Sequence, residues 1–490
     1  MSMAGKADAV LEWHLGSARP LVLELDELGT QISMVDGKTA SICPQSAQEI
    51  CSPGPVVRLA PDEVDVTDID AIKQIYDSKE TFKKSSFYRN LTAVRAPVLF
   101  VLTDVTTHRR MRRLMSTPMS ASSLKLHVPL VQSRVNLYIQ SIKNEMLSRG
   151  CADVFKWNMF LATDLIGELS FGESFKTLEH GEKNQYVHLV ESIGPMGAVR
   201  SAFPRLVSLA SIMPLPILKS AANASREIRR YGEESLGRYY KLASKDTGIA
   251  HQTLFTKLRQ SEQDGEITFE EICANAQGYI LAGSDTTAST LTYLIWSVCR
   301  RPHMQQHLVQ QLEALPPDFD DDDLRNVAYL SRVIDETLRL FTAAPSGLPR
   351  EVPAEGASLA GYQLGGGTVV CAQSYSMHRD PDVFPDPEEF DPLRWEDPSK
   401  AMMEAFMPFG RGPRSLNLAR MELRIAAASF FRAFPNIRIS AKEGFSDRDM
   451  QPKMFFVSNP VGRRCLVESS LAQGGTEGNQ VDKRSQSTLA

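Results

Sequence analysis

A helical pattern from Phe269 to Arg300 constrains the fold more than any other feature of the sequence. Thr268 and Glu271 form a capping box at the start of the pattern, and Pro302 ends it. At 1.5 Å per residue the helix would span about 48 Å, which is longer than most helices of globular proteins. The pattern therefore predicts a long helix that serves as a structural spine.

Apolar residues at three- and four-residue steps predict further helices along most of the chain. Their expected positions are 131–146, with a stop at Gly150, then roughly 153–169, 182–193, 222–245 and 322–341, and finally Leu416 to Phe431. Alternating residues predict half-buried strands at 56–59 and 63–66, and Gly and Pro turns join short strands over 345–375. The fold class is mainly α with a small β-rich subdomain.

The composition argues against several other classes of protein. A net charge of -5 on 490 residues gives no electrostatic case for nucleic-acid binding. The seven cysteines show no C-x-x-C pairing, which favours reduced, structural cysteines over a zinc site. The sequence contains no run of eighteen apolar residues, so no membrane-spanning helix is predicted.

The middle of the long helix is unusually polar, because it runs Ala282-Gly283-Ser284-Asp285-Thr286-Thr287. Glycine costs about 1 kcal/mol in a helix relative to alanine, and Asp and Thr compete for backbone hydrogen bonds. One interpretation is a solvent-facing polar patch with a tolerated glycine. The other is a kinked groove in which a small ligand approaches the backbone and an acid–alcohol pair, Asp285 and Thr286, transfers protons.

Two charged motifs are weaker signals. Glu336 and Arg339 lie three residues apart on one helical face, and such a pair contributes only about 0.2–0.5 kcal/mol when exposed. The run from His108 to Arg113 is either a solvated charged face or an anion site with His108 and Arg112 on one side of a helix.

The stretch from Phe406 to Ser415 is more distinctive. It holds two Phe, two Gly, two Pro and two Arg immediately before a helix. A loop of this composition is rigid and turns tightly. It also directs backbone N–H groups toward a helix N-terminus, where negative charge is favoured.

Taken together and in this order, the motifs resemble those of the cytochrome P-450 family. Five motifs carry the resemblance: the oxygen-groove motif at Ala282–Thr287, E-x-x-R at Glu336 and Arg339, the meander Phe390–Trp395 with Arg394, the start of the haem loop at Phe409-Gly410-x-Gly412-x-Arg414, and the following helix at Leu418–Glu422. The resemblance covers roughly residues 53–467. It is strongest to filamentous-fungal enzymes of secondary metabolism.

The resemblance implies the prism fold of that family, a haem b cofactor and electrons from NADPH through a cytochrome P-450 reductase. It implies monooxygenase chemistry, such as hydroxylation or desaturation, on a lipophilic metabolite of the polyketide or mycotoxin kind. Phe87, Phe100, Phe455 and Phe456 would suit such a substrate, but each could equally belong to the core. A monomer on the cytosolic face of the endoplasmic reticulum is expected by family, with a cytoplasmic location as the alternative because the sequence has no anchor.

The resemblance also assigns roles to residues. Asp285 and Thr286 would be catalytic and relay protons. Haem contacts would come from His108, Arg112, Ala282, Gly283, Arg350, Phe409 and Arg414. Glu336, Arg339 and Arg394 would form a buried structural ion cluster. The basic residues expected where a reductase docks are Arg109, Arg110, Arg113, Arg411 and Arg420.

The sequence departs from the family at the haem loop. The family has a cysteine two places after the loop arginine and a glycine two places further on, but here Arg414 is followed by Ser415, Leu416, Asn417 and Leu418. The simplest alignment removes a Cys-x-Gly triplet between Ser415 and Leu416. Because the axial thiolate donates electron density to the iron, its loss predicts weak or absent haem binding and no monooxygenase activity.

Three explanations fit this departure: a splicing or gene-model error, a genuine inactivating allele, or a P-450 fold kept as a binding or scaffold protein without redox chemistry. Residues 1–52 are expected to be a divergent segment without a membrane anchor, 53–467 the P-450 domain, and 468–490 a disordered polar tail.

Overall fold

The computed structural model describes three strands within 23–44 and then residues 54–76, 81–91, 96–116, 120–185, 188–189, 216–245, 253–411, 417–454 and 457–469. The expected helix over 182–193 lies largely outside these residues, as do Arg414, Phe455, Phe456 and nearly all of the tail from 468 to 490. No helix of the described part is long and apolar enough to cross a membrane.

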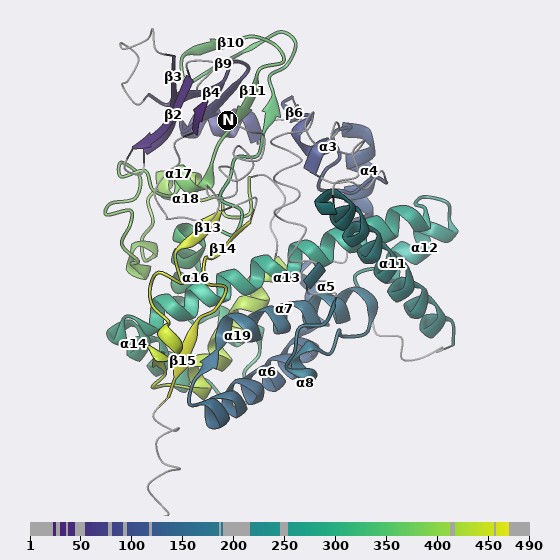
Figure 1. Ribbon diagram of the computed structural model, residues 1–490, viewed down its shortest axis with the longest axis vertical. Helices are drawn as coiled ribbons and strands as arrows, with labels where there is room; N and C mark the ends of the chain where they lie inside the picture. Colours follow the sequence, from purple (N-terminus) through teal and green to yellow (C-terminus); the bar gives the residue numbers. More distant parts are fainter. Residues whose placement is uncertain are drawn as a thin grey trace, which may run out of the picture.

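The predicted spine is confirmed as helix α13 (Phe269–Cys299), which crosses the middle of the molecule (Figure 1). The capping box is present: the Glu271 N–H donates to the Thr268 hydroxyl (3.2 Å), and the Thr268 N–H donates to the Glu271 carboxylate (2.8 Å). The helices with the most contacts to the spine are α7 (Val154–Phe171), α11 (Pro216–Lys245), α19 (Asn417–Ala433) and α16 (Ala328–Leu340).

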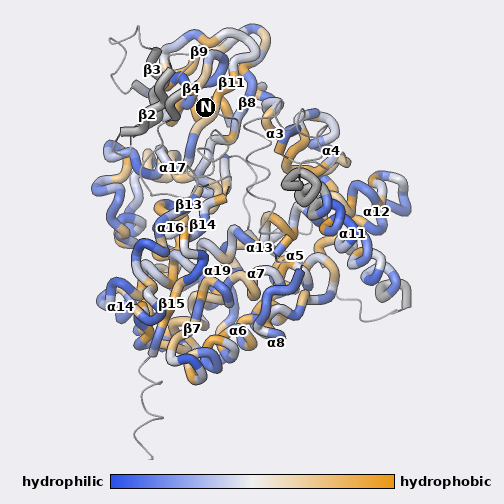
Figure 2. The backbone as a smooth tube through the Cα atoms, in the orientation of Figure 1, coloured by the Kyte–Doolittle hydropathy of each residue, from blue (hydrophilic) through white to orange (hydrophobic). Residues whose placement is uncertain are grey.

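The other helices surround this centre. In chain order they are α2 (Ile69–Tyr76), α3 (Phe87–Leu91), α4 (Val105–Ser116), α5 (Ala121–Lys125), α6 (Val128–Arg149), α8 (Thr177–His180), α12 (Thr256–Gln263), α14 (Pro302–Glu313), α15 (Asp321–Arg325), α17 (Ser374–Met377) and α18 (Lys400–Ala405), with short 3-10 turns η2 (Pro392–Trp395) and η3 (Lys442–Gly444). The hydrophilic character of the peripheral helices α12 and α14 is visible in Figure 2. Gly150, at φ 77°, ends α6 as predicted, because glycine alone adopts this conformation without strain.

The strands form small sheets at one end of the molecule and along one side. Their bounds are β1 (Leu23–Leu25), β2 (Thr30–Val35), β3 (Lys38–Pro44), β4 (Val56–Ala60), β5 (Glu63–Val66), β6 (Lys83–Lys84), β7 (Ala152–Asp153), β8 (Arg350–Glu351), β9 (Ala357–Leu359), β10 (Tyr362–Leu364), β11 (Val369–Cys371), β12 (Arg438–Ile439), β13 (Pro452–Met454), β14 (Ser458–Pro460) and β15 (Leu466–Glu468). The largest sheet has the order β4-β5-β11-β8-β6, and its β5/β11 pair is parallel. The mainly helical fold class with a small β-rich part is confirmed.

One predicted helix is wrong in its extent. The expected helix over 322–341 is two helices, α15 and α16, separated at Asn326 and Val327. Asp320 caps the first helix with its own side chain, so the acidic run belongs to a separate short turn of helix. The apolar stripe that suggested one helix begins only with Tyr329 and Leu330.

The largest hydrophobic cluster lies where α6, α7, α13, α16 and α19 meet. A second cluster lies under the five-stranded sheet, and a third joins α2, α18 and the irregular segment around Trp395. The segments that carry the candidate site connect these clusters.

Candidate functional site

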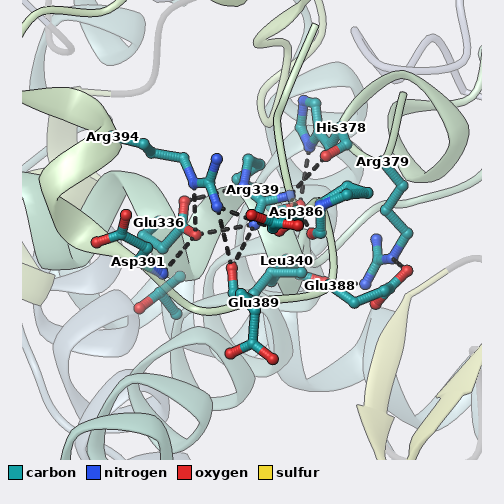
Figure 3. A network of polar contacts seen from close by, with 12 residues as sticks. Glu336, Arg339, Leu340, His378, Arg379, Asp386, Glu388, Glu389, Asp391 and Arg394 are labelled. Carbon is teal, nitrogen blue, oxygen red and sulfur yellow. Dashed lines mark hydrogen bonds and ion pairs between the residues drawn. The ribbon is translucent and has the colours of Figure 1, made fainter. Parts of the chain in front are cut away.

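Glu336 and Arg339 of α16 form a fully buried ion pair, and Arg394 of η2 forms a second ion pair with Glu336 (Figure 3). Glu336 accepts hydrogen bonds from Arg339 Nε (2.9 Å) and Nη2 (2.8 Å) and from Arg394 Nε (3.0 Å). The Trp395 indole N–H (3.0 Å) and the Asp391 backbone N–H (2.9 Å) donate to the same carboxylate. A buried carboxylate with this many donors is compensated for the loss of water.

The two arginines use their remaining N–H groups on backbone carbonyls of the meander. Arg339 donates to the carbonyls of His378 (2.7 Å), Pro387 (2.6 Å) and Glu389 (3.0 Å). Arg394 donates to the carbonyl of Pro385 at 2.8 Å. The cluster therefore fixes the irregular segment 378–395, which has little regular secondary structure of its own.

His378 connects this cluster to the start of the haem-loop segment. Its ring is fully buried, and its Nε2 accepts a hydrogen bond from the Met407 backbone N–H at 2.9 Å. On the other side of the ring, Nδ1 lies 3.0 Å from the carbonyl oxygen of Arg339. None of the five sequence motifs assigns a role to His378.

The described part of the loop, 406–411, turns tightly as its composition predicted. Gly410 has φ 75°, and its N–H donates to the Met407 carbonyl at 3.0 Å. A Cβ on Gly410 would lie 3.3 Å from Cδ1 of Leu348, so the loop lies against the segment before Arg350. Arg420 of α19 stacks over the Phe409 ring at 5.6 Å.

Arg350 is buried two residues beyond Leu348. Its Nη1 donates to the Tyr88 hydroxyl at 3.0 Å, and its guanidinium also lies over the Tyr76 ring at 5.2 Å. The Tyr76 hydroxyl in turn donates to the Leu348 carbonyl at 2.9 Å. The structure thus brings Phe409, Gly410 and Arg350 into one neighbourhood around Leu348.

The polar stretch of α13 is an accessible interval in an otherwise buried helix. Ala282 is exposed, and Gly283, Asp285 and Thr286 are half-buried, whereas the helix is almost wholly buried from Thr287 to Cys299. The Thr286 hydroxyl donates to the Ala282 carbonyl at 2.5 Å, which is the competition for backbone acceptors expected of threonine. Asp285 accepts a hydrogen bond from the Asn459 amide of β14 at 2.8 Å.

The interpretation of this stretch as a simple solvent-facing patch does not fit, because Ser284 and Thr287 are buried. The presence of glycine at position 283 is explained by the packing of α7 against α13, which the sequence did not show. A Cβ at position 283 would lie 3.0 Å from Cγ1 of Ile166, so the absence of a side chain there allows α7 to approach α13 closely. A contact of Gly283 with haem stays a prediction.

Glu422 of α19 is a second residue that sequence reasoning left without a role. It is buried, and the Thr287 hydroxyl donates to its Oε2 at 3.2 Å. Burial raises the pKa of Glu422 to about 8, although the hydrogen bond from Thr287 opposes this shift. Only the position of α19 against α13 reveals this contact.

His108 and Arg112 lie on the same side of α4, as their spacing predicted. His108 is buried, and Arg112 is half-buried. The positive charge of Arg112 acts on Tyr279, whose pKa burial raises to about 12. Arg112 is therefore associated with α13 one turn before Gly283. The third cation expected to meet haem, Arg414, lies outside the described residues.

Sequence comparisons with known proteins find relatives over most of the chain. A family model described as Cytochrome P-450 matches residues 31–465, so the match begins within the segment 1–52. The chain is 46% identical over 420 residues to cytochrome P-450 monooxygenase tazI of Aspergillus terreus, covering 85% of this chain and 86% of the relative. It is 36% identical over 451 residues to cytochrome P-450 monooxygenase azaI of Aspergillus niger, covering 86% and 96%, and 31% identical over 428 residues to cytochrome P-450 monooxygenase aflV of Aspergillus parasiticus, covering 85% and 84%.

The chain belongs to the cytochrome P-450 family, and by family it is a haem-dependent monooxygenase. The family works with a redox partner, and its cofactor is held by a cysteine thiolate.

The cysteines present do not fit this requirement. Five have described side chains, all of them buried: Cys151, Cys273, Cys299, Cys371 and Cys465. Burial raises the pKa of each thiol, which disfavours the thiolate form that binds iron. None of them lies in the segment between Phe406 and Leu418, and the side chains of Cys43 and Cys51 lie outside the described part of the chain. The described thiols therefore do not supply the axial ligand that haem requires in this family.

Proposed function

We propose that the scaffold serves the oxidation, by hydroxylation or desaturation, of a lipophilic fungal secondary metabolite with NADPH as the electron source. The observation that carries the proposal is the accessible interval at Ala282, Gly283, Asp285 and Thr286 within the buried spine. An acid and an alcohol that are accessible together inside a helical core suit proton transfer to a bound reactant.

Phe100 is a candidate contact for a lipophilic substrate. It is 44% exposed, and its ring lies edge-on to Tyr88 at 5.7 Å, next to the half-buried Phe87. The Lys84 ammonium lies over the same ring at 5.4 Å, so Phe100 is part of a small aromatic and cationic group. Both interpretations of Phe100, a substrate contact and a packing residue, fit this arrangement.

We propose further that the 490-residue chain is impaired, because the loop after Ser415 lacks its Cys-x-Gly. The test is a reduced carbon-monoxide difference spectrum of the purified protein beside two insertions after Ser415, Cys-Ala-Gly and Ser-Ala-Gly. The first insertion restores loop length and sulfur, and the second restores length alone. We expect the thiolate-type Soret band from the Cys-Ala-Gly protein only.

The outcomes separate the two candidate functions. A thiolate-type band from the unaltered chain would show that the impairment is wrong. If the Cys-Ala-Gly protein has no band either, a scaffold or binding role becomes the better proposal. Sequencing the transcript around the Ser415 codon then shows whether the triplet is absent from the natural message.

Four basic residues expected where a reductase docks have acceptors within the chain. Arg110 pairs with Glu271 at 2.5 Å, and Arg420 pairs with Asp335 at 2.6 Å. Arg113 lies 3.9 Å from Glu266, and Arg411 donates to the Glu404 carbonyl. Because Arg110 and Arg420 are paired with carboxylates, a partner would meet a weaker positive field than the sequence suggests.

A further inference from the structure

We propose that His378 is a positioning residue that holds the entry of the haem loop, at Met407, against the backbone of Arg339. It would thereby make the Glu336–Arg339–Arg394 cluster the reference point for the loop. For its consequence on haem the inference rests on the proposed function, but its geometry concerns this chain alone.

The contacts of the ring determine which nitrogen carries the proton. The Met407 N–H is a donor, so Nε2 must be the acceptor at 2.9 Å. Nδ1 then bears the hydrogen, and it has two acceptors at 3.0 Å, the Arg339 carbonyl and the Thr342 hydroxyl oxygen. The Thr342 hydroxyl uses its own hydrogen on the Leu338 carbonyl at 2.5 Å, which leaves its lone pairs free to accept.

The same ring resists protonation. Burial lowers the pKa of His378 to about 3, and the charges of Arg379 and Arg339 add to this effect, while the hydrogen bond to the Arg339 carbonyl opposes it. His378 therefore stays neutral, in one tautomer, throughout the ordinary working range of pH.

His378 and Arg339 are joined twice. The ring of His378 reaches the Arg339 carbonyl, and the Arg339 guanidinium returns to the His378 carbonyl at 2.7 Å. A second route to the cluster runs beside it, because Phe406 packs on Trp395 at 4.6 Å and the Trp395 indole donates to Glu336. The loop entry at 406–407 is thus fixed by the hydrogen bond of Met407 to His378 and by the packing of Phe406 on Trp395 and on the His378 ring, at 5.5 Å.

A matched pair of variants separates the two nitrogens of the ring. In His378→Gln the amide oxygen can occupy the place of Nε2 and accept from Met407. In His378→Asn the shorter amide reaches the place of Nδ1 and donates to Arg339, but it leaves Met407 without an acceptor. The readout is hydrogen exchange at the Met407 amide, followed by NMR on 15N-methionine-labelled 490-residue chain.

We expect His378→Asn to speed this exchange by about 3- to 10-fold, as the loss of one hydrogen bond implies, and His378→Gln to leave it within about 2-fold. Equal exchange in the two variants would overturn the proposal and leave His378 as a packing residue. Should either variant fail to fold, ring 15N shifts of the wild-type protein decide. A proton on Nδ1 supports the proposal, and one on Nε2 refutes it.

A second arm repeats the pair in the protein with Cys-Ala-Gly inserted after Ser415 and measures haem retained per chain. We expect His378→Gln to retain more haem than His378→Asn, and equal retention would refute the consequence for haem. If no protein in this arm binds haem, the proposed function fails, while the exchange result still decides the role of His378.

Discussion

Glu336 shows how much a single buried carboxylate depends on its partners. Its side chain and that of Arg339 have 0% exposure, so neither charge is solvated if the other is removed. The cost of isolating a buried charge exceeds the gain from most single contacts, because desolvation is no longer compensated.

Arg339→Met should therefore lower the free energy of unfolding by about 3–5 kcal/mol in urea titration, since it leaves the Glu336 carboxylate without its main donor. The matched control is Arg230→Met, which removes an exposed partner of Glu227 on α11 and should cost less than about 1 kcal/mol. Similar losses from the two substitutions would contradict a buried, charged cluster.

Glu422 makes a prediction about pH. Its pKa is about 8 in the folded protein against an ordinary value of 4.5, so between these limits the folded state holds a proton that the unfolded state has lost. Stability therefore falls as pH rises through this window, by at most about 1.4 kcal/mol per pH unit, and changes no further above it.

The substitution Glu422→Gln removes this titration and can still accept from Thr287. We expect the wild type to lose about 1–3 kcal/mol relative to Glu422→Gln between pH 6 and pH 8 in urea unfolding. Parallel pH profiles for the two proteins would show that the carboxylate is already ionised in the fold.

At the scale of elements, the contact between α7 and α13 depends on the missing side chain at Gly283. Gly283→Val should cost about 1–3 kcal/mol, because the new methyl groups collide with Ile166. Ile166→Ala in the same chain should recover part of this loss, which a double-mutant cycle measures.

Gly237 of α11 supplies the control. A Cβ there has no neighbour within 4 Å, so Gly237→Ala should stabilise the protein by up to about 1 kcal/mol through helix propensity. If Gly283→Val proved as harmless as Gly237→Ala, the close approach of the two helices would be refuted.

Elements defined by interactions between residues close in sequence could be predicted, whereas those defined by contacts distant in sequence could not. The bounds of α13 were predictable because a capping box and a proline are local signals. The break at Asn326 and Val327 was not, because the periodicity on either side of it is compatible with one helix. The strands β4 and β5 were predicted from alternation, but the parallel partner of β5, β11, is distant in sequence.

The candidate site shows the same difference between local sequence signals and contacts distant in sequence. Motif residues could be recognised singly, yet the bridging ring of His378 joins residues 29 apart, and the contact between Thr287 and Glu422 spans 135. Such contacts depend on the packing of whole elements, so no local pattern reveals them.

Over the whole molecule, α19 is held by contacts that do not involve the loop before it. Arg424 pairs with Asp321 of α15 at 2.7 Å, and Arg420 pairs with Asp335 of α16. In haem-free protein, inserting Cys-Ala-Gly after Ser415 should then change the free energy of unfolding by less than about 1 kcal/mol, because a few added loop residues cost little closure entropy. A loss above about 3 kcal/mol in urea titration would show that the insertion shifts the register of α19.

The ion pairs that hold α19, Arg420 with Asp335 and Arg424 with Asp321, affect how the expressed protein can be judged. Yield and solubility report mainly on the frame that holds α19, and the contacts of Arg420 and Arg424 with Asp335 and Asp321 do not include the position of the triplet. A screen for well-behaved protein would accept both forms, whereas the colour of the cell pellet would distinguish them at a glance.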